Sequence, residues 1–157
     1  MNNDLQSLTV LLKQAEEQRD EALVLMQQAD KRAQGAQAQA EQLLAYRGQY
    51  RQRWVQQFSA SAAIEIVQCY QGFGERLEQA IAHQQQVVAQ CQAQAERMRE
   101  LVQQRELRVA SVRKLIERRQ QEQRRVEERR DQKLTDEAAQ RSGWNSNLPS
   151  RMVNQFS

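Results

Sequence analysis

The apolar residues of this chain recur every seven positions over almost its whole length, in two series separated by a gap near residue 60. Within each series the steps alternate between four and three residues. A sustained repeat of this period keeps one narrow apolar stripe of a helix facing a partner helix, as in a coiled coil. The first series is Met1, Leu5, Leu8, Leu12, Ala15, Arg19, Ala22, Met26, Ala29, Ala33, Ala36, Ala40, Leu43, Arg47, Tyr50 and Trp54. The second is Val67, Tyr70, Gly74, Leu77, Ile81, Gln84, Val88, Cys91, Ala95, Met98, Val102, Arg105, Val109, Val112 and Ile116.

The composition favours two helices that meet along one narrow apolar line, here called the seam, over the larger core of a globular enzyme. Apolar residues make up 39% of the 157 residues and aromatic residues only 5%, below the usual apolar share of about 45–50%. One proline, Pro149, and five glycines leave most of the chain free of helix breakers. A rod of this kind encloses no pocket, so we expect it to act by contacting other proteins.

The break between the two series divides the predicted all-α fold. The sequence predicts one helix from about residue 5 to 58, a turn at about 59–61 and a second helix from about 62 to 141. Ser142 and Gly143 are expected to end it, because glycine readily takes the left-handed conformation at a helix C-terminus. Residues 1–141 then form one coiled-coil domain, and residues 142–157 a flexible tail rich in Asn and Ser.

Two geometries fit this division: one very long helix that dimerises, or an antiparallel hairpin folded near Ala60. The lost register around residue 60 favours the hairpin, and therefore a monomer on its own. Folding near Ala60 sets Tyr50 opposite Tyr70 and Leu43 opposite Leu77. It also sets the alanines between residues 29 and 40 opposite residues 81–88.

The predicted arms of the hairpin are unequal. Met1 would lie opposite about residue 119, and the apolar repeat fades beyond Ile116. About 22 residues, or roughly 33 Å of helix at about 1.5 Å per residue, are left to project from the hairpin. An isolated helix of that length is marginal in water, so this overhanging C-terminal helix is expected to need a partner.

The overhang from Arg113 to Arg141 is dense in charges of both signs. It holds ten basic and seven acidic residues, and this excess equals the +3 net charge of the whole chain. Arginine pairs alternate there with pairs of acids. Nucleic-acid contacts usually cluster one sign, whereas this alternation is typical of an exposed salt-bridged helix or of a contact with a mixed-charge protein.

Residue types for catalysis or metal binding are sparse. The chain has a single histidine, His83, and lacks HExxH, CxxC, GxSxG and glycine-rich phosphate motifs. The sequence therefore predicts no enzymatic activity, no cofactor and no metal. Cys69 and Cys91 lie about 33 Å apart on one predicted helix, which excludes an intrachain disulfide and fits a reducing compartment.

The ends and hydropathy of the chain predict a cytoplasmic protein. The first residues show no basic region followed by an apolar run, so we expect no secretory signal. Nowhere are there 18 consecutive apolar residues, so no direct membrane insertion is expected.

A second stripe widens the apolar face near the predicted turn. Phe73, Leu77, Ala80 and Gln84 follow an i, i+4, i+7, i+11 spacing that leans off the seam. Two interpretations stay open: wider core packing against Tyr50 and Trp54, or an exposed ridge that docks on a partner.

Three short segments of the chain, in order, carry further information. The first, Gln42-Leu43-Leu44-Ala45-Tyr46-Arg47-Gly48-Gln49-Tyr50, has a Leu-x-x-Tyr-x-x-x-Tyr pattern at the end of the first predicted helix. The second runs from Tyr70-Gln71-Gly72-Phe73 to Leu77-Glu78-Gln79-Ala80-Ile81. The third joins Asp131-Gln132-Lys133 with Asp136-Glu137 and Arg141. Together these three segments resemble the FliJ family of flagellar type III export proteins.

The resemblance implies a cytoplasmic stalk similar to the central γ subunit of rotary ATPases. Such a stalk inserts into the hexameric flagellar export ATPase, contacts the cytoplasmic domain of the membrane export gate and cycles export chaperones. It is peripheral to the inner face of the cell membrane and serves flagellar assembly, motility and chemotaxis. The implied gate-binding residues are Phe73, Leu77, Ala80 and Gln84; the implied ATPase-binding residues are Gln132, Lys133, Asp136, Glu137 and Arg141.

The alternatives are a related virulence type III secretion stalk, or a generic structural or RNA-binding coiled coil. An RNA-binding coiled coil would lose affinity steeply as salt rises.

Overall fold

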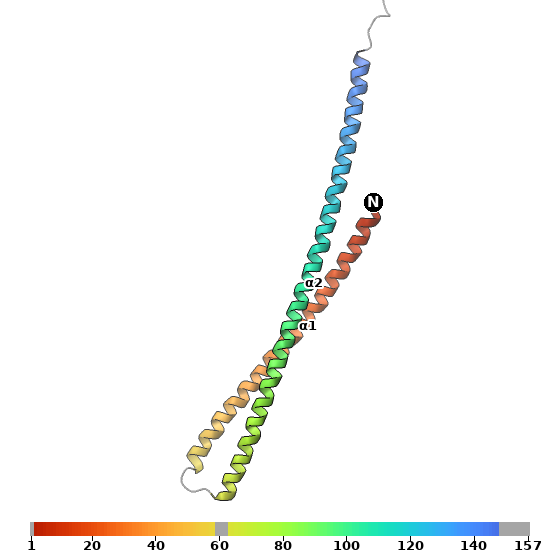
Figure 1. Ribbon diagram of the computed structural model, residues 1–157. Helices are drawn as coiled ribbons and strands as arrows, with labels where there is room; N and C mark the ends of the chain where they lie inside the picture. Colours follow the sequence, from red (N-terminus) through yellow and green to blue (C-terminus); the bar gives the residue numbers. More distant parts are fainter. Residues whose placement is uncertain (1, 59–62, 148–157) are drawn as a thin grey trace, which may run out of the picture. The chain divides into compact units, whose positions relative to one another are not determined.

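The described part of the chain, residues 2–58 and 63–147, consists of two long helices in a computed structural model (Figure 1). Helix α1 covers Asn2–Phe58 and helix α2 covers Ile64–Ser146. No strand occurs among the described residues. The predicted all-α, two-helix architecture is confirmed. The predicted turn at 59–61 lies outside the described residues.

Two compact units make up the chain, and the larger one, Lys13–Ala110, is an antiparallel hairpin. Its side chains join positions of α1 and α2 whose sequence separation shrinks toward the turn, as an antiparallel pair requires. The joined pairs are Gln18 with Arg105, Asp30 with Arg99, Ala36 with Gln84, and Tyr50 with Tyr70. The last pair confirms the predicted placement of Tyr50 opposite Tyr70.

The buried residues of this hairpin seam are all alanines on α1 and mostly larger aliphatic residues on α2. On α1 the buried residues are Ala15, Ala22, Ala29, Ala36 and Ala40; on α2 they are Leu77, Ile81, Val88, Ala95, Val102 and Val109. These residues follow the predicted repeat, so the apolar residues of each helix meet along one line. Ala36, Ala40 and Val88 form one contiguous cluster, with Val87 and Cys91 packed against it.

The described residues of the second unit are 2–12 and 111–147. Val112 is buried in it, and Leu5, Leu8 and Leu12 are half-buried. From residue 117 to 147 every side chain is exposed except two half-buried ones, Gln123 and Val126. The overhanging C-terminal end of α2 is therefore a solvated helix, as the fading repeat predicted.

The predicted end of α2 at Ser142-Gly143 is wrong. The helix continues to Ser146, and Gly143 has no positive φ. The backbone N–H of Asn147 still donates to the Gly143 carbonyl at 3.2 Å, and the Ser146 hydroxyl donates to the same oxygen at 2.9 Å. Glycine permits a left-handed cap but does not impose one. Residues 142–146 are thus helical rather than tail, and residues 148–157 lie outside the described chain.

The seam leads to a prediction about stability. Leu77 is only 8% exposed, so Leu77→Ala should lower the free energy of unfolding by about 2–5 kcal/mol. Leu43→Ala should cost less, because that side chain is half-buried. Urea denaturation followed by circular dichroism measures both changes. The control is Leu44→Ala, which alters an exposed neighbour of Leu43. Equal urea midpoints for Leu77→Ala and Leu44→Ala would contradict the burial of Leu77 in the seam.

Candidate functional site

The described residues contain no group of three or more His, Cys, Asp or Glu placed to hold a metal ion. No described helix is long and apolar enough to cross a membrane. Both thiols are free, with Cys69 exposed and Cys91 half-buried. Two surfaces with distinctive side chains lie at the end of the hairpin that carries Tyr50 and Tyr70 and on the exposed end of α2.

An aromatic cluster joins the two helices near the turn. Trp54 stacks on Tyr70 with ring centroids 3.8 Å apart, and Tyr50 stacks on Tyr70 at 4.3 Å. Phe73 lies against Tyr50 at 4.8 Å and against Tyr46 at 6.4 Å. Aromatic pairs of this kind contribute about 0.5–1.5 kcal/mol beyond the area they bury. They hold this end of the hairpin together where the alanine seam has given way to large rings.

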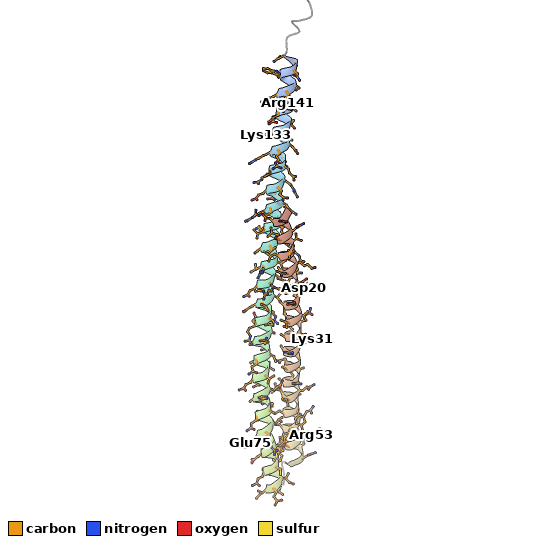
Figure 2. All side chains as sticks on the ribbon, turned by 90° about the vertical axis from the view of Figure 1, so that its right-hand side faces the viewer. Asp20, Lys31, Arg53, Glu75, Lys133 and Arg141 are labelled. Atoms are coloured by element: carbon orange, nitrogen blue, oxygen red, sulfur yellow. The ribbon has the colours of Figure 1, made fainter. Side chains whose placement is uncertain are left out.

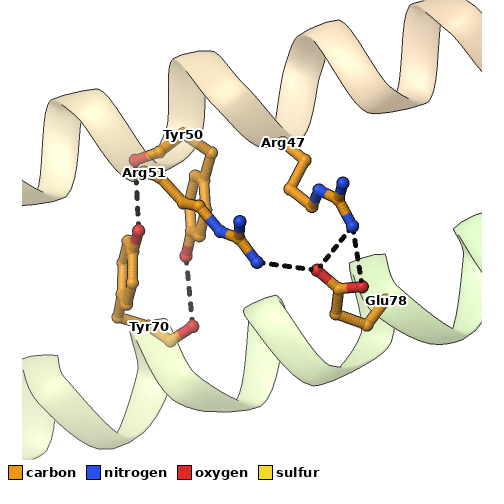
Figure 3. A network of polar contacts seen from close by, with 5 residues as sticks. All are labelled: Arg47, Tyr50, Arg51, Tyr70 and Glu78. Carbon is orange, nitrogen blue, oxygen red and sulfur yellow. Dashed lines mark hydrogen bonds and ion pairs between the residues drawn. The ribbon is translucent and has the colours of Figure 1, made fainter.

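Two tyrosines of this cluster are also bonded to each other's backbone (Figure 3). The Tyr50 hydroxyl donates to the Tyr70 carbonyl at 3.2 Å, and the Tyr70 hydroxyl donates to the Tyr50 carbonyl at 3.1 Å. Burial raises the pKa of the Tyr50 phenol above its usual value, and the neighbouring phenols of Tyr70 and Tyr46 raise it further. The phenol is therefore held in its protonated, donating form.

Beside the tyrosines, two arginines of α1 share one carboxylate of α2 (Figure 3). Arg47 lies 3.1 Å and Arg51 3.3 Å from the oxygens of Glu78. This trio was not predicted from the sequence. The signal was present, however, because Arg47 occupies an apolar position of the repeat, and a charge there needs a partner across the seam.

The four residues of the predicted gate-binding stripe differ in accessibility. Leu77 is buried in the seam, whereas Phe73 is 38% exposed at the edge of the aromatic cluster. Ala80 is exposed. Gln84 is half-buried and donates from its amide to the carbonyl of Ala36 at 3.0 Å. Phe73 and Ala80 are thus the accessible members, and the other two support the helix pair beneath them.

The five residues predicted to bind an ATPase are all exposed on the solvated end of α2. Lys133, Glu137 and Arg141 are four positions apart and share one face of the helix, since such residues are neighbours on its surface. Figure 2 shows Lys133 and Arg141 projecting from this segment. The full set is Gln132, Lys133, Asp136, Glu137 and Arg141.

Trp144 adds a surface feature that was not predicted from the sequence. It is 76% exposed, and a hollow of about 440 Å³ lies beside it, lined also by Glu137 and Arg141. Because α2 continues to Ser146, the indole is fixed on the same helix as the charged set. The sequence did contain a signal for it, a tryptophan directly after Gly143, but that glycine was interpreted as the end of the helix.

Residues 4–148 match the family model described as flagellar FliJ protein. The match covers both helices almost in full. No curated protein matches the chain, and no solved structure does.

The Tyr50 phenol makes the hairpin sensitive to alkali. A phenol whose pKa is raised in the folded state contributes stability that is present below its unfolded pKa of about 10 and is lost as the pH rises through the folded pKa. The urea midpoint should therefore fall between pH 8 and pH 11, and it should fall less in Tyr50→Phe. Tyr46→Phe removes only the smallest of the three causes of the raised Tyr50 pKa, so its midpoint should fall almost as far as that of the unaltered chain. An equal fall in all three proteins would exclude the phenol as the cause.

Proposed function

The chain belongs to the flagellar FliJ family, and on that premise we propose that it is a stalk or adaptor of the flagellar type III export apparatus. In this role it links the hexameric export ATPase to the cytoplasmic domain of the membrane export gate and cycles export chaperones. The family is a non-catalytic export component, and the proposed role uses no cofactor and no nucleic acid. The proposed location is the cytoplasm at the flagellar base, peripheral to the cell membrane.

The exposed end of α2 is the observation that carries this proposal. Between residues 118 and 141 the chain has eight basic and six acidic side chains, and in the described structure none of them forms an ion pair. Residues 117–147 bury almost nothing within their own unit. An unsupported helix of this length is marginal in water, so a partner that surrounds it and offers both charge signs would stabilise it.

The ring of the export ATPase fits as that partner. Lys133, Glu137 and Arg141 present both charge signs on one face of a single helix, narrow enough to enter a channel. Many modest ion pairs of this kind set the orientation and the rate of association more than the final affinity. The family match favours this role over a generic structural or RNA-binding coiled coil.

The export gate is proposed to bind near the turn, at Phe73 and Ala80. Phe73 offers an exposed ring edge that its neighbours hold in place, and rigid aromatic anchors of this kind are frequent interface hot spots. Leu77 and Gln84 would contribute indirectly, because they fix the position of α2 against α1.

Removing the exposed end of α2 tests the proposed ATPase contact. A chain cut after Glu117 should lose co-elution with the export ATPase in size-exclusion chromatography. Lys133→Glu or Arg141→Glu should slow association and make its rate less dependent on salt, because basic side chains steer encounter with an acidic surface. Lys31→Glu, an exposed reversal on α1 (Figure 2), is the control and should associate normally. Unchanged binding by the shortened chain would contradict the proposal.

The proposed gate contact is tested at Phe73. Phe73→Ala should weaken binding to the cytoplasmic domain of the gate by about 2 kcal/mol, the order of a typical hot spot, measured by titration calorimetry. Ile66→Ala, another exposed apolar side chain of α2, should bind as the unaltered chain does. Melting curves recorded in parallel separate the two interpretations of Phe73. A lower melting temperature with intact affinity would identify it as packing only.

A further inference from the structure

A groove opens between α1 and α2 beside the paired tyrosines. It has a volume of about 500 Å³, within the range of about 300–1,000 Å³ typical of ligand sites. Its floor is apolar and its rim is charged, the arrangement found at the core and edge of protein interfaces. Floor and rim are formed by Tyr50, Tyr70, Gly74 and Leu77, with Arg47, Arg51, Glu75, Glu78 and Gln79 around them.

Gly74 keeps this floor open. The residue is helical, has no positive φ, and a Cβ added to it would meet no heavy atom within 4 Å. Neither the backbone conformation nor packing within the described chain therefore requires a glycine at this position. Glycine inside a helix lowers its stability relative to alanine. A residue that weakens the helix and leaves a hollow suits close approach by a group from another molecule.

The charges of the groove are sorted by helix. Arg47 and Arg51 form the α1 side, and Glu75 and Glu78 form the α2 side. Glu78 already binds both guanidinium groups, but the Arg51 side chain is 67% exposed and has further N–H donors to offer. Glu75 is exposed, and its carboxylate forms no ion pair in the described structure. The groove therefore offers a donor row on one side and an unpaired carboxylate on the other.

The groove is separate from the face that carries Phe73 and Ala80. Successive residues of a helix are about 100° apart around its axis, which places Glu78 and Ala80 about 160° from each other. Leu77, buried between the two faces, is the only member of the gate-binding stripe that lines the groove. A partner in the groove would thus leave the exposed ring edge of Phe73 uncovered.

We propose that this groove is a second docking surface, which binds an amphipathic helix of a partner protein. One large aliphatic or aromatic side chain of that helix lies over Gly74, against Leu77 and the tyrosine rings. Its acidic flank faces the arginines of α1, and its basic flank faces Glu75. The sorting of charge across the groove fixes this orientation, and helix-in-groove binding with an apolar anchor is a common mode of recognition.

In-cell photo-crosslinking from the rim of the groove identifies the occupant. The photoreactive amino acid p-benzoylphenylalanine is placed at Gln79 of the full chain in flagellated cells, and the crosslinked segment is mapped by mass spectrometry. A control chain carries it at His83, which is exposed and does not line the groove. We expect the Gln79 crosslink to map to a helix of another protein with one large apolar residue between an acidic and a basic flank. That crosslink should be absent from the His83 control.

Filling the groove then tests the mode of binding, with a synthetic peptide of the mapped segment as the probe. Gly74→Met should raise the melting temperature of the full chain and weaken peptide binding at least tenfold in fluorescence anisotropy. Gly35→Met is the matched control, since Gly35 is also helical with open space around it and lies away from the groove. It should raise the melting temperature without changing peptide affinity. Arg51→Glu should weaken binding, and a peptide with lysines in place of its acidic flank should restore it.

Three results would overturn the proposal. One is a Gln79 crosslink that maps only to a second copy of this chain. Another is a Gln79 crosslinking pattern identical to that from His83. The third is a peptide affinity that Gly74→Met leaves unchanged.

Discussion

The alanine seam of the larger unit is the contact on which the rest of the structure depends. The buried repeat positions are alanines on α1 and valine, leucine, isoleucine and alanine on α2, and an alanine side chain has little apolar area to remove from water. Burial stabilises by about 25 cal/mol per Å², so no single layer holds the helices together. The stability comes from repetition, which requires both helices to keep register over many heptads.

The need to keep register explains why the residue types in the seam change toward the turn. Large rings replace alanines there, and Tyr50 and Tyr70 bond to each other's backbone. Directional hydrogen bonds and stacked rings fix the relative position of two helices more strictly than aliphatic contacts do. On one side of the seam, Arg47 and Arg51 of α1 also form ion pairs with Glu78 of α2. The same rigid end supplies both surfaces proposed for partners, the edge of Phe73 and the groove over Gly74.

In the other unit, the end of α2 is a helix without a buried seam. Its side chains from residue 117 to 147 are almost all exposed, and most are charged or polar; the helix nevertheless continues through Gly143 to Ser146. Strong helix formers, chiefly Glu, Arg, Gln and Ala, fill this segment and favour the helix without a seam. Charges that find no partner among the described residues are available to another protein, which is the basis of the proposed contact with the export ATPase.

The sequence by itself determined the two helices, their antiparallel pairing and the solvated end. All three follow from where a seven-residue repeat runs, breaks and fades, and repeat positions depend only on helix geometry. The resemblance to FliJ proteins also came from local segments, and the family match confirmed it. Only the tertiary structure decided which side chains are buried in the seam and which ones contact each other across it. It buried Leu77 while leaving Phe73 exposed, paired Arg47 and Arg51 with Glu78, and opened the groove over Gly74. These outcomes depend on the rotation of each helix about its axis and on competition between neighbouring side chains, which a one-dimensional pattern does not contain.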